Sequence, residues 1–319
     1  MSRSVHSLAI AAICASTVLA SAQANSSATE PASPPVAFVY VTSNPASGGG
    51  EIYGAVVAAN GSATLIPGSP FLYNVNYMAV NSAWLFGVAN LDDSIDSFSI
   101  AENGALSLEQ TVAVPTGGGV ISIYLDHTGS TLYADYYTTN NDFYSYSIDQ
   151  STGQLSQIGD LPGGPPENTP VSFIGNNVYA YSSSCYHFGP EIFGVQRASS
   201  GTLTYINNFN PPFPSEKSGG FYCPWLAAAD PTNHLAIAMV PLNSNWDQDG
   251  PWQLATYTAD SSGNLTTNST NSNMPSVSVG GVNDYRMSRL ANTWLWEERE
   301  AFRFFTSTAR IQSRRLREY

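Results

Sequence analysis

The amino-acid sequence predicts an all-β protein, a β-propeller built from four-stranded blades. Short strands of alternating apolar and polar residues fill the chain, and one strand–turn–strand unit recurs five times. No 12-residue window in the body of the chain has a helical period. Four short strands in every 43 to 62 residues is the spacing of a propeller blade. Tandem β-sandwiches, the alternative, would need about seven strands and roughly 100 residues per module.

The first 24 residues have the features of a secretory signal peptide. A basic start precedes an apolar run from Leu8 to Ala20, and a small-x-small cleavage site, AQA, follows. This run is too short to cross about 30 Å of hydrocarbon as a helix. We therefore expect cleavage between Ala24 and Asn25 and export to the periplasm or the extracellular space. Residues 25–36 are expected to form a polar linker rich in Pro and Ser.

The repeat that follows is a strand, a turn with glycine, and a second strand that opens with leucine, as in IDSFSIAENGALS and FYSYSIDQSTGQLS. Successive turn glycines are 43, 49, 48 and 62 residues apart. The five turn glycines are Gly61, Gly104, Gly153, Gly201 and Gly263. Each unit continues with a proline-containing loop and two apolar strands, such as WLAAAD from Trp225 and TLYADYY from Thr131. FVYVTS, from Phe38, is expected to be the second strand of a blade. We expect the repeats to occupy residues 37–288.

Composition changes abruptly near the C-terminus. All 26 Gly and 20 Pro precede residue 286, whereas residues 286–319 hold eight of the 11 basic residues. We expect residues 289–319 to be an anomalous Arg-rich tail produced by a frameshift. Codons can be chosen for this peptide so that the same bases, read in a frame displaced by two, encode a pair of strands with glycine and proline. The chain would then be a truncated, non-functional product, and a native basic helix is the alternative.

The sequence FVYVTSN from Phe38, the paired I-x-x-F and Gly-x-Leu strands, and PGSPF at residues 67–71 resemble the YVTN-repeat family of seven-bladed, lactonase-like β-propellers. The resemblance covers about residues 37 to 288. It implies seven blades, of which this chain has about five to six. The family includes lactonases of sugar-phosphate lactones, a muconate cycloisomerase, and exported members without an assigned reaction.

The body of the chain is acidic. Between Asn25 and Tyr285 lie 20 acidic residues and only two basic ones, Arg197 and Lys217, and the whole chain has a net charge of -13. This balance argues against nucleic acids, anionic membranes and phosphorylated substrates as partners. Arg197 precedes a turn glycine at the outer edge of its blade, where we expect a solvated side chain.

His187 and Glu191 are the candidate catalytic residues. They lie in an inter-strand loop that could overhang a channel mouth, where general acid–base groups would belong. The alternative is an ordinary loop, since a His four residues from a Glu is a common pattern. The sequence has no nucleophile elbow, zinc-binding His cluster or phosphate-cradling glycine loop, so no cofactor is predicted.

Asp247 and Asp249, in WDQDG, resemble part of a calcium loop. The later ligands and the terminal Glu are missing, so no metal site is predicted, and an acidic loop is the alternative. Trp225, Trp246 and Trp252 could form a sugar-binding platform. Trp225, however, lies in an apolar strand, where we expect it in the core.

Two aspartates begin matching turns, DHTG at Asp126 and DPTN at Asp230, and we expect them to bind the backbone of their own turns. His127 and His234, in or beside these turns, are expected to be exposed.

Cys185 and Cys223 are the two cysteines that remain after signal cleavage. Export favours a disulfide between them, and two buried free thiols are the alternative. No cation lies near either one in the sequence to lower a thiol pKa, which argues against a catalytic cysteine.

These observations favour an exported scaffold or binding module whose partner is an unknown small molecule or protein. The first alternative is a lactonase-type hydrolase of a neutral lactone or sugar-derived ring, and the second is the truncated product described above. We expect no membrane span, and a monomer if the propeller ring closes.

Overall fold

The computed structural model describes residues 35–43, 50–89, 93–115, 118–137, 141–164, 171–185, 190–215, 219–277, 282–287, 293–298 and 302–306. Every regular element among these residues is a β-strand, so the all-β class is confirmed. None of the described segments is a helix that could cross a membrane.

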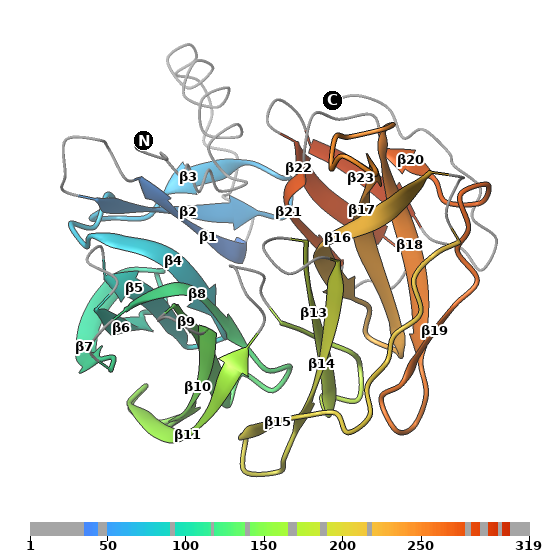
Figure 1. Cartoon of the computed structure of the whole chain (residues 1–319). Helices are drawn as coiled ribbons and strands as arrows, with labels where there is room; N and C mark the ends of the chain where they lie inside the picture. The colour runs from blue at the N-terminus through green and yellow to red at the C-terminus, as the bar shows by residue number, and fades with distance from the viewer. Residues whose placement is uncertain are drawn as a thin grey trace. The chain divides into compact units, whose positions relative to one another are not determined.

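The chain divides into two compact units, Met1–Leu125 with Ser147–Ser156 and Asp126–Tyr146 with Gln157–Tyr319. The first unit contains two complete antiparallel sheets (Figure 1). Their strands are β1 (Pro35–Ser43), β2 (Glu51–Ala58) and β3 (Ala63–Leu65), then β4 (Val75–Val80), β5 (Trp84–Ala89), β6 (Ser94–Ile100) and β7 (Leu106–Ala113). The division runs through the next sheet, which comprises β8 (Gly119–Leu125), β9 (Thr131–Tyr137), β10 (Asn141–Ile148) and β11 (Leu155–Gly164).

The second unit contains three further sheets (Figure 1). The first comprises β12 (Ser172–Phe173), β13 (Tyr179–Ser184), β14 (Glu191–Arg197) and β15 (Leu203–Tyr205). The second comprises β16 (Gly220–Ala229), β17 (His234–Asn243), β18 (Trp252–Ala259) and β19 (Leu265–Thr267), with β20 (Ser276–Val277) paired to β18. The third comprises β21 (Val282–Met287), β22 (Thr293–Glu298) and β23 (Phe302–Thr306).

Apart from β20, neighbouring strands in each sheet follow one another in the sequence, which is the blade pattern of a β-propeller. In the four-stranded sheets the turn glycine joins the third strand to the fourth. In the first sheet Gly61 joins β2 to β3, so β1 takes the place of a second strand, as expected from its sequence. The leucines that follow the other turn glycines begin the fourth strands and are buried: Leu106, Leu155, Leu203 and Leu265.

The same turns connect successive sheets within each unit. A hydroxyl on one sheet donates a hydrogen bond to the carbonyl of the turn glycine in the next. In the first unit these bonds join Tyr40 to Gly104 and Ser97 to Gly153, both at 2.7 Å. In the second unit they join Tyr133 to Gly201 at 2.8 Å and Tyr181 to Gly263 at 2.7 Å. The repeat therefore specifies both the hairpin and the contact with the preceding sheet.

The expected tail has strands where its backbone is described. β22 and β23 lie within it. β22 pairs with β21, with Tyr285 opposite Trp296, and β23 pairs with β22, with Arg303 opposite Trp296. The alternative of one basic helix is therefore wrong for residues 293–298 and 302–306. The frameshift origin of the tail stays a prediction, which the nucleotide sequence of the gene tests. The expected cleavage site and linker lie outside the described residues, apart from residues 35 and 36.

Candidate functional site

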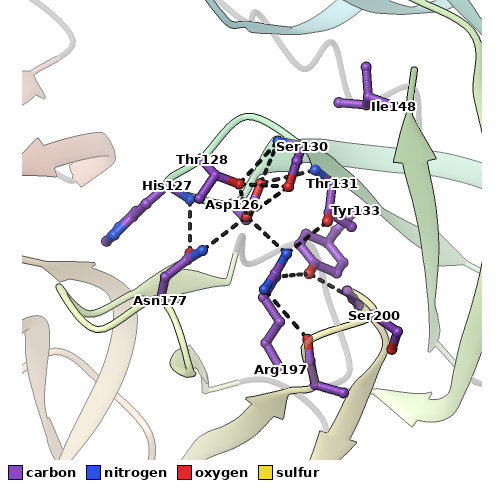
Figure 2. A network of polar contacts seen from close by, with 12 residues as sticks. Asp126, His127, Thr128, Ser130, Thr131, Tyr133, Ile148, Asn177, Arg197 and Ser200 are labelled. Carbon is purple, nitrogen blue, oxygen red and sulfur yellow. Dashed lines mark hydrogen bonds and ion pairs between the residues drawn. The ribbon is translucent and has the colours of Figure 1, made fainter. Parts of the chain in front are cut away.

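Arg197 is the only arginine or lysine whose side chain the structure describes. The sequence predicts that this side chain is solvated, and the structure shows that it is mostly buried. Its side chain is 13% exposed, and its Nη2 lies 3.1 Å from Oδ2 of Asp126, whose side chain is fully buried. Nε donates to the Tyr133 hydroxyl at 3.1 Å, and Nη2 donates to Thr131 Oγ1 at 3.1 Å. The end of β14 lies against the β8–β9 turn of the preceding sheet, a contact that the local sequence does not reveal (Figure 2).

Asp126 has the turn role that its sequence predicts. Its Oδ1 accepts hydrogen bonds from the backbone N–H groups of Ser130 and Thr131, both at 2.9 Å. Burial alone would raise the pKa of Asp126, but hydrogen bonds from Thr128, Asn177 and Thr131, with the Arg197 charge, lower it from its ordinary value. Figure 2 shows Asp126 at the centre of this network. The ion pair is an internal structural contact, so Arg197 is not free to bind an anionic ligand.

The matching turn at Asp230 behaves similarly. Oδ1 of Asp230 accepts from the N–H groups of Thr232 at 2.8 Å and His234 at 3.1 Å, and His234 is exposed as expected. His127 is exposed as well. These histidines occupy turn surfaces, and neither lines either of the two hollows described below.

Glu191 begins β14 at the edge of a surface hollow of about 320 Å³. Tyr205, Phe209, Asn210 and Phe213 also line this hollow, which we call the Glu191 hollow. The Glu191 side chain is half-buried, and burial raises its pKa. A carboxyl group whose pKa is raised in this way can serve as a general acid or base. His187, its expected partner, lies outside the described residues.

Asp247 and Asp249 lie in the exposed loop between β17 and β18. The described residues contain no group of three or more His, Cys, Asp or Glu side chains that could hold a metal ion. The two aspartates stay candidates from the sequence alone, and we assign no metal or cofactor to them.

Cys185 and Cys223 form a disulfide with 5.2 Å between their Cα atoms. They line a second hollow of about 550 Å³ with Trp225, Trp246 and Trp252, which we call the tryptophan hollow. The other lining residues are Val240, Leu242 and Gln248.

Trp225 is not a core residue, contrary to the sequence-based expectation, since it is 39% exposed. The register of β16 against β17 shifts between Pro224 and Leu226, so Trp225 is the extra residue of a β-bulge. A bulge redirects the side chain that it carries. The apolar run WLAAA therefore predicts the strand correctly but the direction of its first side chain wrongly.

Asp135 is a buried carboxyl group that the sequence analysis missed. It lies in β9 with 0% exposure, and neither carboxyl oxygen has a hydrogen-bond partner among the described residues. Burial, with the nearby charge of Asp142, raises the pKa of Asp135 well above its ordinary value. The signal in the sequence was a lone Asp within the apolar strand TLYADYY, where a charged residue is seldom accommodated.

The fold is similar to that of solved β-propellers at low sequence identity. A periplasmic gluconolactonase from Pseudomonas aeruginosa is 15% identical, with a TM-score of 0.56 over 85% of this chain and 78% of that one. A Bacteroides fragilis protein whose description as a 6-phosphogluconolactonase is provisional is 14% identical, with a TM-score of 0.58 over 86% and 79%. A Lactobacillus plantarum protein is 16% identical, with a TM-score of 0.56 over 85% and 78%.

No family model matches the chain. No curated protein matches it in sequence either. The likeness to these solved structures shows the fold alone, a β-propeller.

Proposed function

We propose that the protein is a lactonase-type hydrolase that opens a neutral lactone or sugar-derived ring, with Glu191 as its general base. The observation that carries the proposal is the half-buried Glu191 carboxyl, whose pKa burial raises, at the edge of a ligand-sized hollow. The fold adds support, because similar folds include the periplasmic gluconolactonase from Pseudomonas aeruginosa.

The reaction needs one group that first accepts a proton and then returns it. Ionised Glu191 would take a proton from a water molecule while the water oxygen bonds to the lactone carbonyl carbon. The ring C–O bond then breaks, and the leaving oxygen takes the proton back from Glu191. One water is consumed, the product is a hydroxy acid, and Glu191 is regenerated.

A neutral substrate follows from the described charges. Arg197 is held by Asp126, so no described cationic side chain is free to bind a phosphate or carboxylate. The excess of acidic residues would also repel an anionic substrate. We therefore expect glucono-1,5-lactone to be a better substrate than its 6-phosphate.

The test measures acid release from a panel of neutral and phosphorylated lactones across pH, with spontaneous hydrolysis subtracted. Wild-type activity should rise through a midpoint above the ordinary glutamate range, since the base must be ionised. Glu191→Gln should lower kcat at least 100-fold, in keeping with general base catalysis. Glu102→Gln, in an exposed turn, is the matched control and should retain activity.

Full activity in Glu191→Gln would refute the assigned base. A folded wild-type protein that hydrolyses no lactone in the panel would refute the enzymatic function. That second result would favour the other candidate, an exported binding module, which the exposed aromatic surface of the tryptophan hollow supports. We also propose export, which the disulfide and the periplasmic location of one similar structure support.

A further inference from the structure

We propose that the tryptophan hollow is a binding site for a neutral sugar ring, separate from the Glu191 hollow. Its volume of about 550 Å³ lies within the range of small-molecule sites, roughly 300–1,000 Å³. Residues from β16, β17, β18 and the loop between β17 and β18 line it, and Cys185, which follows β13, completes the lining.

Two of the three indole rings in this hollow are exposed, and each of these two packs against another aromatic ring. Trp225 is 39% exposed and Trp246 is 54% exposed, although tryptophan is normally well buried. The ring of Trp225 lies edge-on to that of buried Trp252, with 5.9 Å between centroids. The ring of Trp246 lies edge-on to Phe221 at 4.8 Å. Several large aromatic groups gathered around one concave surface indicate a binding site.

The loop that carries Trp246 is organised before any ligand arrives. Trp246 has a φ of 66°, in the left-handed region, which is unfavourable for a residue other than glycine. Its N–H donates to the Asn243 carbonyl at 3.0 Å. Oδ1 of Asn243 accepts from the N–H groups of Asn245 at 2.8 Å and Asp247 at 3.0 Å. Folding therefore meets the cost of this conformation, and a ligand does not have to order the loop.

The disulfide fixes another part of the lining. Cys185 follows β13 and Cys223 lies in β16, and the bond joins these two segments. Trp225 is two residues from Cys223, in the bulge described above. The disulfide thus fixes the strand that carries Trp225, and the hydrogen-bonded loop fixes Trp246.

The chemistry of the lining favours a neutral sugar. The C–H face of a pyranose packs against an aromatic ring, while its hydroxyl groups need polar partners at the edge. Gln248 supplies an amide in the wall, held by its Nε2 bond of 2.8 Å to the Gly250 carbonyl. Asp247 and Asp249 flank it on the exposed loop and would disfavour an anionic ligand.

The experiment titrates the full chain with methyl α-glucoside, maltose, cellobiose and N,N′-diacetylchitobiose, using calorimetry and thermal unfolding. None of these is a lactone, so binding is measured independently of hydrolysis. We expect at least one to bind with millimolar affinity and to raise Tm. Trp246→Ala should weaken that binding roughly tenfold, equivalent to about 1.4 kcal/mol. Gln248→Ala should weaken it without removing an aromatic ring.

Tyr53→Ala is the matched control, because Tyr53 is also 39% exposed but lies in β2, outside the hollow. It should leave the affinity unchanged. No binding of any saccharide by the folded wild type, or undiminished binding in both Trp246→Ala and Gln248→Ala, would overturn the proposal. Glu191→Gln should bind the sugar normally, so loss of lactone hydrolysis and loss of sugar binding test the two proposals separately.

Discussion

The Tyr181 hydroxyl donates a hydrogen bond of 2.7 Å to the carbonyl of Gly263, which lies 82 residues further along the chain. Tyr181 is fully buried in β13, and Gly263 is the turn glycine between β18 and β19. Its N–H donates to the Asp260 carbonyl within the same turn at 3.1 Å. One glycine thus closes a hairpin and accepts the bond from the preceding sheet.

Tyr181→Phe should lower the free energy of unfolding by about 1–2 kcal/mol, because the Gly263 carbonyl then lacks this partner inside the protein. Tyr205→Phe is the control. Its hydroxyl donates a hydrogen bond of 3.1 Å to the Pro162 carbonyl. This bond is exposed to solvent, so water can take the place of the hydroxyl as donor. Urea denaturation compares the two variants, and equal losses would contradict the importance of the buried bond.

Gly263→Ala should be more destabilising than Gly61→Ala, although both glycines have a φ of 82°. A Cβ at Gly263 would lie 2.5 Å from Tyr179 Cδ1, whereas a Cβ at Gly61 would meet nothing within 4 Å. The backbone conformation costs both variants about 1–2 kcal/mol. Thermal unfolding measures the further loss at Gly263, and two equal values of Tm would refute a packing role for this turn.

Arg197→Met should lower stability at pH 7 by about 3 kcal/mol, since it leaves buried Asp126 without its cation. The native pKa of Asp126 is lowered, so the unfolded state binds the proton more tightly. Its contribution is present above the unfolded pKa of about 3.9 and is lost as pH falls through the lower native value. Urea denaturation from pH 7 to pH 3, with Asp126→Asn completing a double-mutant cycle, measures the coupling. Additive single losses would contradict the ion pair.

Asp135→Asn should stabilise the protein at neutral pH by more than about 1 kcal/mol, because it removes a buried, unpaired carboxyl group. The native pKa of Asp135 is raised, so the native state binds the proton more tightly. Stability from this group is therefore complete below the unfolded pKa of about 3.9 and declines as pH rises toward the native value. Asp142→Asn removes the charge of the half-buried neighbour and leaves Asp135 in place, so it should increase the free energy of unfolding by less than Asp135→Asn. A larger gain at pH 4 than at pH 8 would contradict this assignment.

Alkylation of the unfolded, unreduced protein should leave Cys185 and Cys223 unmodified, and reduction should expose both to the reagent. Mass spectrometry of the peptides measures this directly. Loss of the bond in Cys185→Ser should cost about 2–4 kcal/mol, because the bridge closes a loop across 38 residues. Modification of both cysteines before reduction would show free thiols instead.

The strands and turns could be predicted from the sequence because their causes are local. Alternation of side chains identified TLYADYY as a strand, and the observed β9 begins at Thr131 as expected. The turn glycines were also recognisable, since all five have a positive φ that glycine adopts without a Cβ penalty. Asp126 was assigned correctly to its turn for the same reason, because its backbone partners lie within five residues.

The environment of individual side chains was decided only by the tertiary structure. Arg197 was expected in solvent and is instead paired with Asp126 in the preceding sheet. Trp225 was expected in the core, but a bulge turns it outward. This bulge is recognised only from the register of β16 against β17. The burial of Asp135 was not predicted from the sequence and depends on the packing around β9. Burial, ion pairing and the shape of a hollow depend on atoms that the fold brings together from distant positions in the chain. Strand alternation and turn geometry, in contrast, depend on residues that are adjacent in the sequence.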